Sequence, residues 1–167
     1  MSSSSAASKR TLLLLLGLFS LPVIAAALVL KLGWYQGGST NHGQLLSDLS
    51  YQQLRVANPA EQTWQIVTFV PNQCDHACQQ HLQQLNQAHI ALGREHTRVI
   101  PIAYSSEAIT APERFRQVIN PPLQQALAPY AMVVVDPWGQ WVLGYQQGQS
   151  RDMLLDLRKL LKLSRIG

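Results

Sequence analysis

The sequence lacks the residue patterns of several large enzyme classes. It has no spaced pair of catalytic carboxylates, no nucleophile triad and no glycine-rich loop of the phosphate-binding type. No internal repeat is visible. The function must therefore be sought in a few unusual residues and not in a familiar catalytic signature.

Charge of either sign is also scarce, and beyond residue 33 ten basic residues face nine acidic ones. Because there is no basic stripe with interleaved aromatic residues, nucleic acid is not expected as a partner. The cluster Arg158, Lys159, Lys162 and Arg165 falls in the last turns of a predicted helix. Cations there complement the helix dipole, so we interpret this cluster as a solvated face and not as a binding patch.

One segment has no charge at all, the run TLLLLLGLFSLPVIAAALVL from Thr11 to Leu30. At 1.5 Å per residue it covers about the 30 Å core of a bilayer, which predicts a transmembrane helix over 11–32. A cleaved signal peptide is the alternative, since small residues occur at 25–27. The apolar run continues past that point through residues 28–30, which favours the membrane helix.

The basic residues around the run predict its orientation. Lys9 and Arg10 precede it, and Lys31 alone follows it closely. By the positive-inside rule, we expect a single-pass protein of a bacterial inner membrane with a cytoplasmic N-terminus and a periplasmic C-terminal domain. The expected division is a tail over 1–10, the membrane helix over 11–32, a linker over 33–48 and a domain over 49–167. Trp34 and Tyr35 are expected as interfacial anchors.

The remaining pattern predicts one compact α/β domain. Apolar runs predict strands over 64–70, 98–104, 130–136 and 140–145, the last two forming a hairpin around the turn at 137–139. Helical spacing predicts a helix from the cysteines to Gly93, a broken helix over 112–127 and a closing helix capped by Ser150. Pro101 suggests a bulge or an edge position in its strand. The order β-α-β-α-β-β-α predicts a mixed sheet with helices on both faces.

Cysteine is scarcer still: the sequence has only two, Cys74 and Cys78, within TFVPNQCDHACQQHL at 68–82. We expect Cys74 at the helix start, where free N–H groups and the dipole stabilise a thiolate, and Cys78 one turn later as its more buried partner. At this spacing the Cα atoms lie about 6 Å apart, which suits a disulfide. Two thiolates also suit Cu(I). A permanent disulfide is the alternative, although so short a loop adds little stability.

Cysteines at the first strand-to-helix junction, in this order of elements, are similar to the thioredoxin fold. The C-x-x-x-C spacing of CDHAC (74–78) resembles the Sco family of membrane-anchored copper chaperones for cytochrome oxidase. The chain resembles more closely the small single-span, thioredoxin-like proteins found among cytochrome c oxidase assembly genes in proteobacteria. The matching features are GWYQGGSTNHGQLL, CDHAC, VVVDPWGQWVLGYQQG and LLDLRKLLKLSRIG. The resemblance implies a thioredoxin-like domain behind one membrane helix, with oxidase subunits or assembly factors as partners.

One departure from the Sco pattern concerns copper. Sco proteins carry a copper-binding histidine shortly before the hairpin, but the corresponding stretch QALAPYAMVVVD (125–136) contains none. His81 and His76 lie near the cysteines, yet Cys74 and His81 are about 10 Å apart on a regular helix, too far for one tetrahedral centre. We therefore name Cys74 and Cys78 as candidate redox residues and Cu(I) ligands, and His81 as a weaker ligand candidate.

Three functions stay open from the sequence. The first is a membrane-tethered accessory protein for oxidase assembly that acts by thiol redox or transient Cu(I) handling. The second is a non-catalytic docking protein with a permanently closed disulfide, and the third is a general thiol–disulfide oxidoreductase. Pro129 is expected either as a cis proline facing the cysteines or as an ordinary strand-edge proline.

Overall fold

A computed structural model describes residues 4–32, 41–46 and 49–166. The chain divides into two compact units, residues 1–40 and 41–167, which are described separately. Trp34 and Tyr35, predicted as interfacial anchors, and most of the predicted linker lie outside the described residues.

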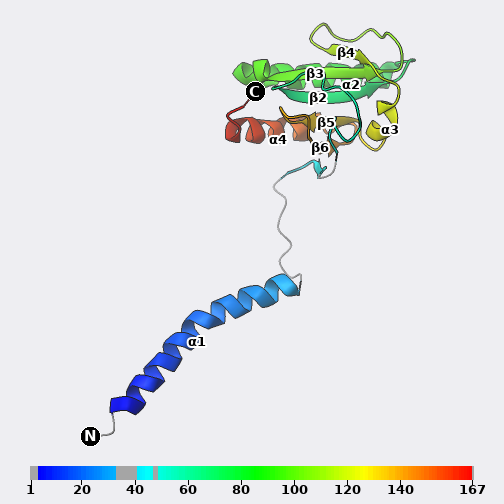
Figure 1. Cartoon of the computed structure of the whole chain (residues 1–167). Coiled ribbons are helices and arrows are strands. Elements are labelled where there is room, and N and C mark those ends of the chain that lie inside the picture. Colours follow the sequence, from blue (N-terminus) through cyan, green and yellow to red (C-terminus); the bar gives the residue numbers. More distant parts are fainter. Residues whose placement is uncertain (1–3, 33–40, 47–48, 167) are drawn as a thin grey trace. The chain divides into compact units, whose positions relative to one another are not determined.

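The first unit is the helix α1, Ser4–Lys31, with Pro22 inside it (Figure 1). Its segment Lys9–Lys31 has 23 residues, a mean hydropathy of 2.7 and no buried part. By length and composition this helix is able to cross a membrane. The prediction of one N-terminal apolar helix is confirmed, and the helix begins earlier than the apolar run because small residues at 4–8 continue it.

The second unit is a six-stranded mixed sheet with helices on both faces (Figure 1). The strand order is β1-β6-β5-β2-β3-β4, in which β2, β3 and β4 are parallel and β5, β6 and β1 join by antiparallel pairing. The strands are β1 (Gln44–Leu45), β2 (Trp64–Val70), β3 (Val99–Ser105), β4 (Arg116–Ile119), β5 (Met132–Val135) and β6 (Trp141–Tyr145). The helices are α2 (His76–Ala91), the 3-10 helix η1 (Gly93–Arg98), α3 (Leu123–Leu127) and α4 (Ser150–Leu163).

Each face of the sheet has its own hydrophobic core. On one face the apolar sides of α2 and α4 pack together, with Leu85 and Leu157 fully buried among their neighbours. On the other face α3 and the segment around Tyr51 cover the sheet. The strand β2 contributes to both cores because its successive side chains point to opposite faces, Ile66 to the first and Val67 to the second. The predicted thioredoxin-like mixed sheet is confirmed.

Two local predictions were wrong, and one short strand was missed. Residues 116–119 form the strand β4 and not a helix, because they pair in parallel with β3 and only one of their four side chains is even half-buried. The closing helix has Gln149 and not Ser150 at its N-cap, with no side-chain capping bond. The two-residue strand β1 was not predicted. Pro101 lies one residue before β3 begins to pair with β4, so that part of β3 has a free side, as the edge interpretation expected.

A buried carboxylate ties the start of this unit to its last helix. Asp156 on α4 is 2% exposed and accepts hydrogen bonds from the backbone N–H groups of His42 (2.7 Å) and Gly43 (3.1 Å), from His42 Nδ1 (3.0 Å) and from Tyr145 Oη (3.1 Å). Burial alone would raise the pKa of this carboxyl, but these bonds outweigh it and hold the pKa below its usual value. Only glycine fits at position 43, since a Cβ there would lie 2.5 Å from Tyr145 Cζ.

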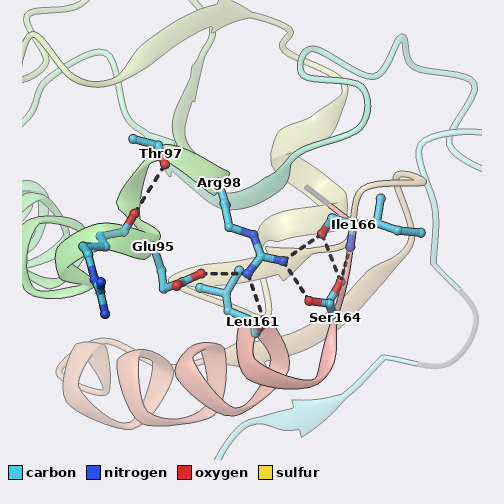
Figure 2. Close-up of polar contacts among 7 residues, drawn as sticks. Glu95, Thr97, Arg98, Leu161, Ser164 and Ile166 are labelled. Carbon is cyan, nitrogen blue, oxygen red and sulfur yellow. Dashed lines mark hydrogen bonds and ion pairs between the residues drawn. The ribbon is translucent and has the colours of Figure 1, made fainter.

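Arg98 binds the C-terminal end of α4 (Figure 2). Its guanidinium donates to the carbonyl oxygens of Leu161 (3.0 Å), Ser164 (2.9 Å) and Ile166 (3.1 Å), and pairs with Glu95 at 2.7 Å. The last carbonyls of a helix have no partner within the helix, and the guanidinium satisfies that of Leu161 while it also holds the carbonyls of Ser164 and Ile166, which follow the helix. We call this set of contacts the Arg98 clamp.

Replacement of Arg98 by lysine should weaken the clamp, because a single ammonium cannot reach three carbonyls and a carboxylate together. We expect the free energy of unfolding to fall by about 1–3 kcal/mol. Urea unfolding of the purified chain, followed by tryptophan fluorescence with the disulfide intact, measures this. Arg94→Lys, an exposed arginine on the same 3-10 helix, is the matched control; equal stability of the two variants would contradict the role of the clamp.

Candidate functional site

The candidate site lies at the C-terminal end of the central strand β2. Cys74 is in the connection between β2 and α2, and Cys78 is in the first turn of α2. The two are joined by a disulfide with their Cα atoms 5.2 Å apart. The spacing therefore places both sulfurs at one helical turn, as the sequence predicted.

The immediate setting of the two cysteines differs from the expectation in two respects. Asp75, not Cys74, is the N-cap of α2, and its Oδ1 accepts the N–H of Cys78 at 2.8 Å. The positive end of the helix is thus already next to a carboxylate, which opposes a second negative charge there. Both cysteines are half-buried and pack against the same core, so Cys78 is not set apart as the buried partner.

A shallow pocket of about 270 Å³ lies beside the disulfide. It is formed by the end of β2, the start of α2, the residue before β5 and the segment after β6. Its lining residues are Phe69, Pro71, Asp75, Ala77, Cys78, His81, Ala131 and Gln147. The pocket gives a partner direct access to the side of Cys78.

His81 is held in this pocket in a form that favours the neutral ring. The Thr68 hydroxyl donates to the carbonyl of Ala131 at 2.8 Å, so it accepts from His81 Nε2 at 3.3 Å. His81 Nδ1 is buried and has no hydrogen-bond partner among the described residues. Burial lowers the pKa of His81, partly offset by the Ala131 carbonyl.

The metal-ligand candidates do not come together as a multidentate centre. Within residues 4–32, 41–46 and 49–166, no three His, Cys, Asp or Glu side chains are grouped closely enough to hold a metal ion. His81 therefore gains no support as a third ligand. Two sulfurs one turn apart remain suited to a soft ion, because linear coordination of Cu(I) needs no third protein ligand.

His42, His89 and His96 contact backbone or carboxylate oxygens. His89 is buried, with Nε2 at 2.9 Å from the Val99 carbonyl and 3.0 Å from that of His96. His42, predicted to belong to the linker, binds Asp156 as described above. The contact of His42 joins segments 114 residues apart, which local sequence patterns do not reveal.

Pro129 precedes β5 at the same edge of the sheet as the cysteines. Every peptide bond among the described residues is trans, so the cis-proline interpretation was wrong. The carbonyl of Pro129 accepts a hydrogen bond from Gln146 Nε2 at 2.9 Å, which ties the two segments on this side of the pocket together.

A central mixed sheet, helices on both faces and a cysteine pair at the first strand-to-helix junction define a protein of the thioredoxin-like class. The profile of the family described as "Transmembrane-like, thioredoxin-like, C-terminal domain" matches residues 64–164, and the chain belongs to this family. No curated protein matches the chain significantly.

Two solved structures with similar folds are Sco proteins. ScoI of Arabidopsis thaliana with copper bound has 14% identity and a TM-score of 0.51 over 62% of this chain and 87% of that one. Apo Sco1 of Thermus thermophilus has 15% identity and a TM-score of 0.50 over 75% of this chain and 98% of that one. The predicted relation to transmembrane-like, thioredoxin-like proteins is confirmed by the family, and the resemblance to Sco proteins is confirmed in fold.

The lowered pKa of His81 predicts a loss of stability in mild acid. The unfolded chain takes up a proton near pH 6.5, whereas the half-buried ring in the folded chain resists protonation until a lower pH. The free energy of unfolding should therefore fall as the pH drops from 7 to 5, by at most about 1.4 kcal/mol per pH unit from this group. Thermal unfolding at both values measures this. His81→Gln should reduce the dependence, and the exposed His76→Gln should leave it unchanged.

The carboxylate of Asp75 should slow the alkylation of the reduced cysteine thiols. In Asp75→Asn the cap is retained, because asparagine caps as well as aspartate, but a negative charge next to the thiols is removed. We expect alkylation of the reduced pair by iodoacetamide at pH 7 to become about two- to fivefold faster, since one nearby charge contributes about 1 kcal/mol in a hydrated setting. Glu113→Gln, an exposed carboxylate elsewhere, is the control; an unchanged rate in Asp75→Asn would contradict the effect.

Proposed function

We propose that this protein is a membrane-tethered, Sco-like accessory protein for cytochrome c oxidase assembly. Its Cys74–Cys78 pair cycles between disulfide and dithiol, and the dithiol holds Cu(I) transiently. The observation that carries the proposal is the position of the pair: two half-buried cysteines are joined across one helical turn, and Cys78 lines a pocket open to solvent. The copper bound to ScoI of Arabidopsis thaliana, on a similar fold, supports the ion.

The redox half of the cycle balances as thiol–disulfide exchange. In the reduced pair one thiolate attacks a substrate disulfide, which forms a mixed disulfide and releases a substrate thiolate. The second cysteine then attacks its neighbour's sulfur, closes the Cys74–Cys78 bond and releases the second substrate thiol. Two electrons pass to the substrate, and a reductant of the thiol class must restore the pair. The half-exposed position of both cysteines allows either one to begin the exchange.

Copper handling uses the same two sulfurs in their reduced form. Asp75 lies between them in the sequence, and its carboxylate adds negative charge that favours a bound cation. Two thiolates hold Cu(I) without a third ligand, so the ion stays accessible to an acceptor with more ligands. This arrangement suits transfer better than storage.

The proposed location is a bacterial inner membrane, with α1 as the single span, a cytoplasmic tail over 1–10 and the domain in the periplasm. The apolar length of α1 supports a membrane span, and the lysine and arginine before it support the orientation. An oxidising compartment suits a cysteine pair that closes reversibly. The expected partners are oxidase subunits or assembly factors in the same membrane.

A docking role with a permanently closed disulfide is the second candidate, because both cysteines pack against the hydrophobic core and are not fully exposed. In that case the pair stabilises the start of α2, and the surface of the domain alone binds the oxidase. The two candidates differ in whether the native protein ever contains free thiols.

A competition titration with Cu(I) tests the proposal. The reduced full-length chain in detergent should bind one Cu(I) at least about tenfold more tightly than Cys74→Ser/Cys78→Ser, a difference of about 1.4 kcal/mol. His81→Ala should bind as tightly as the unaltered chain. Equal weak binding by the unaltered chain and the double variant would remove copper from the function.

A deletion strain separates the redox and docking candidates. If the thiols act, the double serine variant should fail to restore oxidase activity, although it reaches the membrane at normal abundance. Full restoration by that variant would favour docking. Thiol labelling of the native protein is the second measurement. If the pair is never labelled without added reductant, the disulfide is permanently closed.

A further inference from the structure

The end of α4 and the residues after it carry basic and apolar side chains that face solvent. Leu163 is 82% exposed and Ile166 is 44% exposed, and Lys162 and Arg165 beside them are exposed as well. We call these four residues the α4 end patch. Complementing the helix dipole accounts for the two cations. The two aliphatic side chains next to them in the sequence add an apolar component, so the patch combines more than the solvated charged face expected from the sequence.

The Arg98 clamp gives this patch a fixed backbone. Arg98 binds the carbonyls of Ser164 and Ile166, which lie after the last helical turn (Figure 2). The backbone that carries the patch is therefore tied to η1. A surface held in this way does not have to be ordered when it binds, so it loses less entropy on binding.

The chain enters the domain close to this patch. Asp156 binds His42 and Gly43, the first part of the domain after the membrane helix, and Leu163 lies seven residues further along α4, about 10 Å. Only residues 32–41 separate α1 from His42, and even a fully extended chain of that length reaches about 40 Å. If α1 spans a bilayer, a connection of this length raises the effective concentration of the domain at the surface of that bilayer.

We propose that the α4 end patch rests on the anionic phospholipid surface of the bilayer that α1 spans. Lys162 and Arg165 meet the lipid phosphates, and each basic residue near an anionic surface favours the bound state about fivefold. Leu163 and Ile166 enter the boundary between headgroups and acyl chains, as apolar residues of interfacial helices do. A bilayer fits this patch because the patch combines cations with exposed aliphatic residues and belongs to a membrane-tethered chain.

This docking would turn the disulfide away from the lipid. Arg158 on α4 donates to the carbonyl of Ala91 at the end of α2, and Arg98 links the same region to the end of α4. Cys78 lies at the other end of α2, a helix of 16 residues or about 24 Å. With the α4 end patch on the lipid, the cysteine pair faces the aqueous phase, where the domain of a partner is able to reach it.

The test uses the full-length chain, labelled with ¹⁵N, in nanodiscs that carry a gadolinium-chelating lipid headgroup. Discs of phosphatidylcholine alone are compared with discs that also contain phosphatidylglycerol. The amides of residues 160–166 should relax several-fold faster than those of residues 74–78 in the anionic discs, and this difference should shrink as salt is added. Lys162→Gln/Arg165→Gln should weaken the docked state about 25-fold, two fivefold steps.

The control is Arg114→Gln/Arg151→Gln, which removes the same charge from two exposed positions outside the patch. It should leave the relaxation pattern unchanged. Equal relaxation at the two ends of the domain, no dependence on lipid charge, or an equal effect of the control variant would each overturn the proposal. Relaxation of the patch that responds only to an added acidic protein would overturn it in favour of a protein surface. The salt dependence of the relaxation in the unaltered chain tests the proposal without any variant, so it does not depend on whether a variant folds.

Discussion

The whole arrangement depends on the burial of β2 in the middle of the sheet. This strand pairs in parallel with β3 and antiparallel with β5, and six of its seven residues are buried. A slip of one residue would exchange the side chains that face the two cores, so the register is strongly specified. The position at which β2 ends is therefore fixed. This end in turn determines where Cys74 and the start of α2 lie.

The elements with a strong apolar pattern could be predicted from the sequence. Residues 64–70 form β2 as expected, the hairpin of β5 and β6 was found, and the spacing of Cys74 and Cys78 indicated a disulfide. The strand β4 was missed because its side chains are mostly exposed and carry no alternating pattern. The contact of His42 with Asp156 joins residues 114 positions apart, and no local rule indicates such a pair.

The electrostatics of the candidate site could be predicted only in part. A helix start next to a cysteine is visible in the sequence, but the bond from Cys78 N–H to Asp75 depends on the cap geometry. His81 could be named as a neighbour, yet its burial against Thr68 and Ala131 appears only in the fold. Both the capping carboxylate and the burial that lowers the pKa of His81 are therefore properties of the folded chain and not of the local sequence.

The bonds from Asp156 to His42 and Gly43 also have a mechanical meaning. Any pull from a membrane anchor would reach the domain first at these bonds and at the short pairing of β1 with β6, before it reaches the central strands. The carboxylate thus holds the entry of the chain at α4, and not at the end of β2 where the cysteines lie.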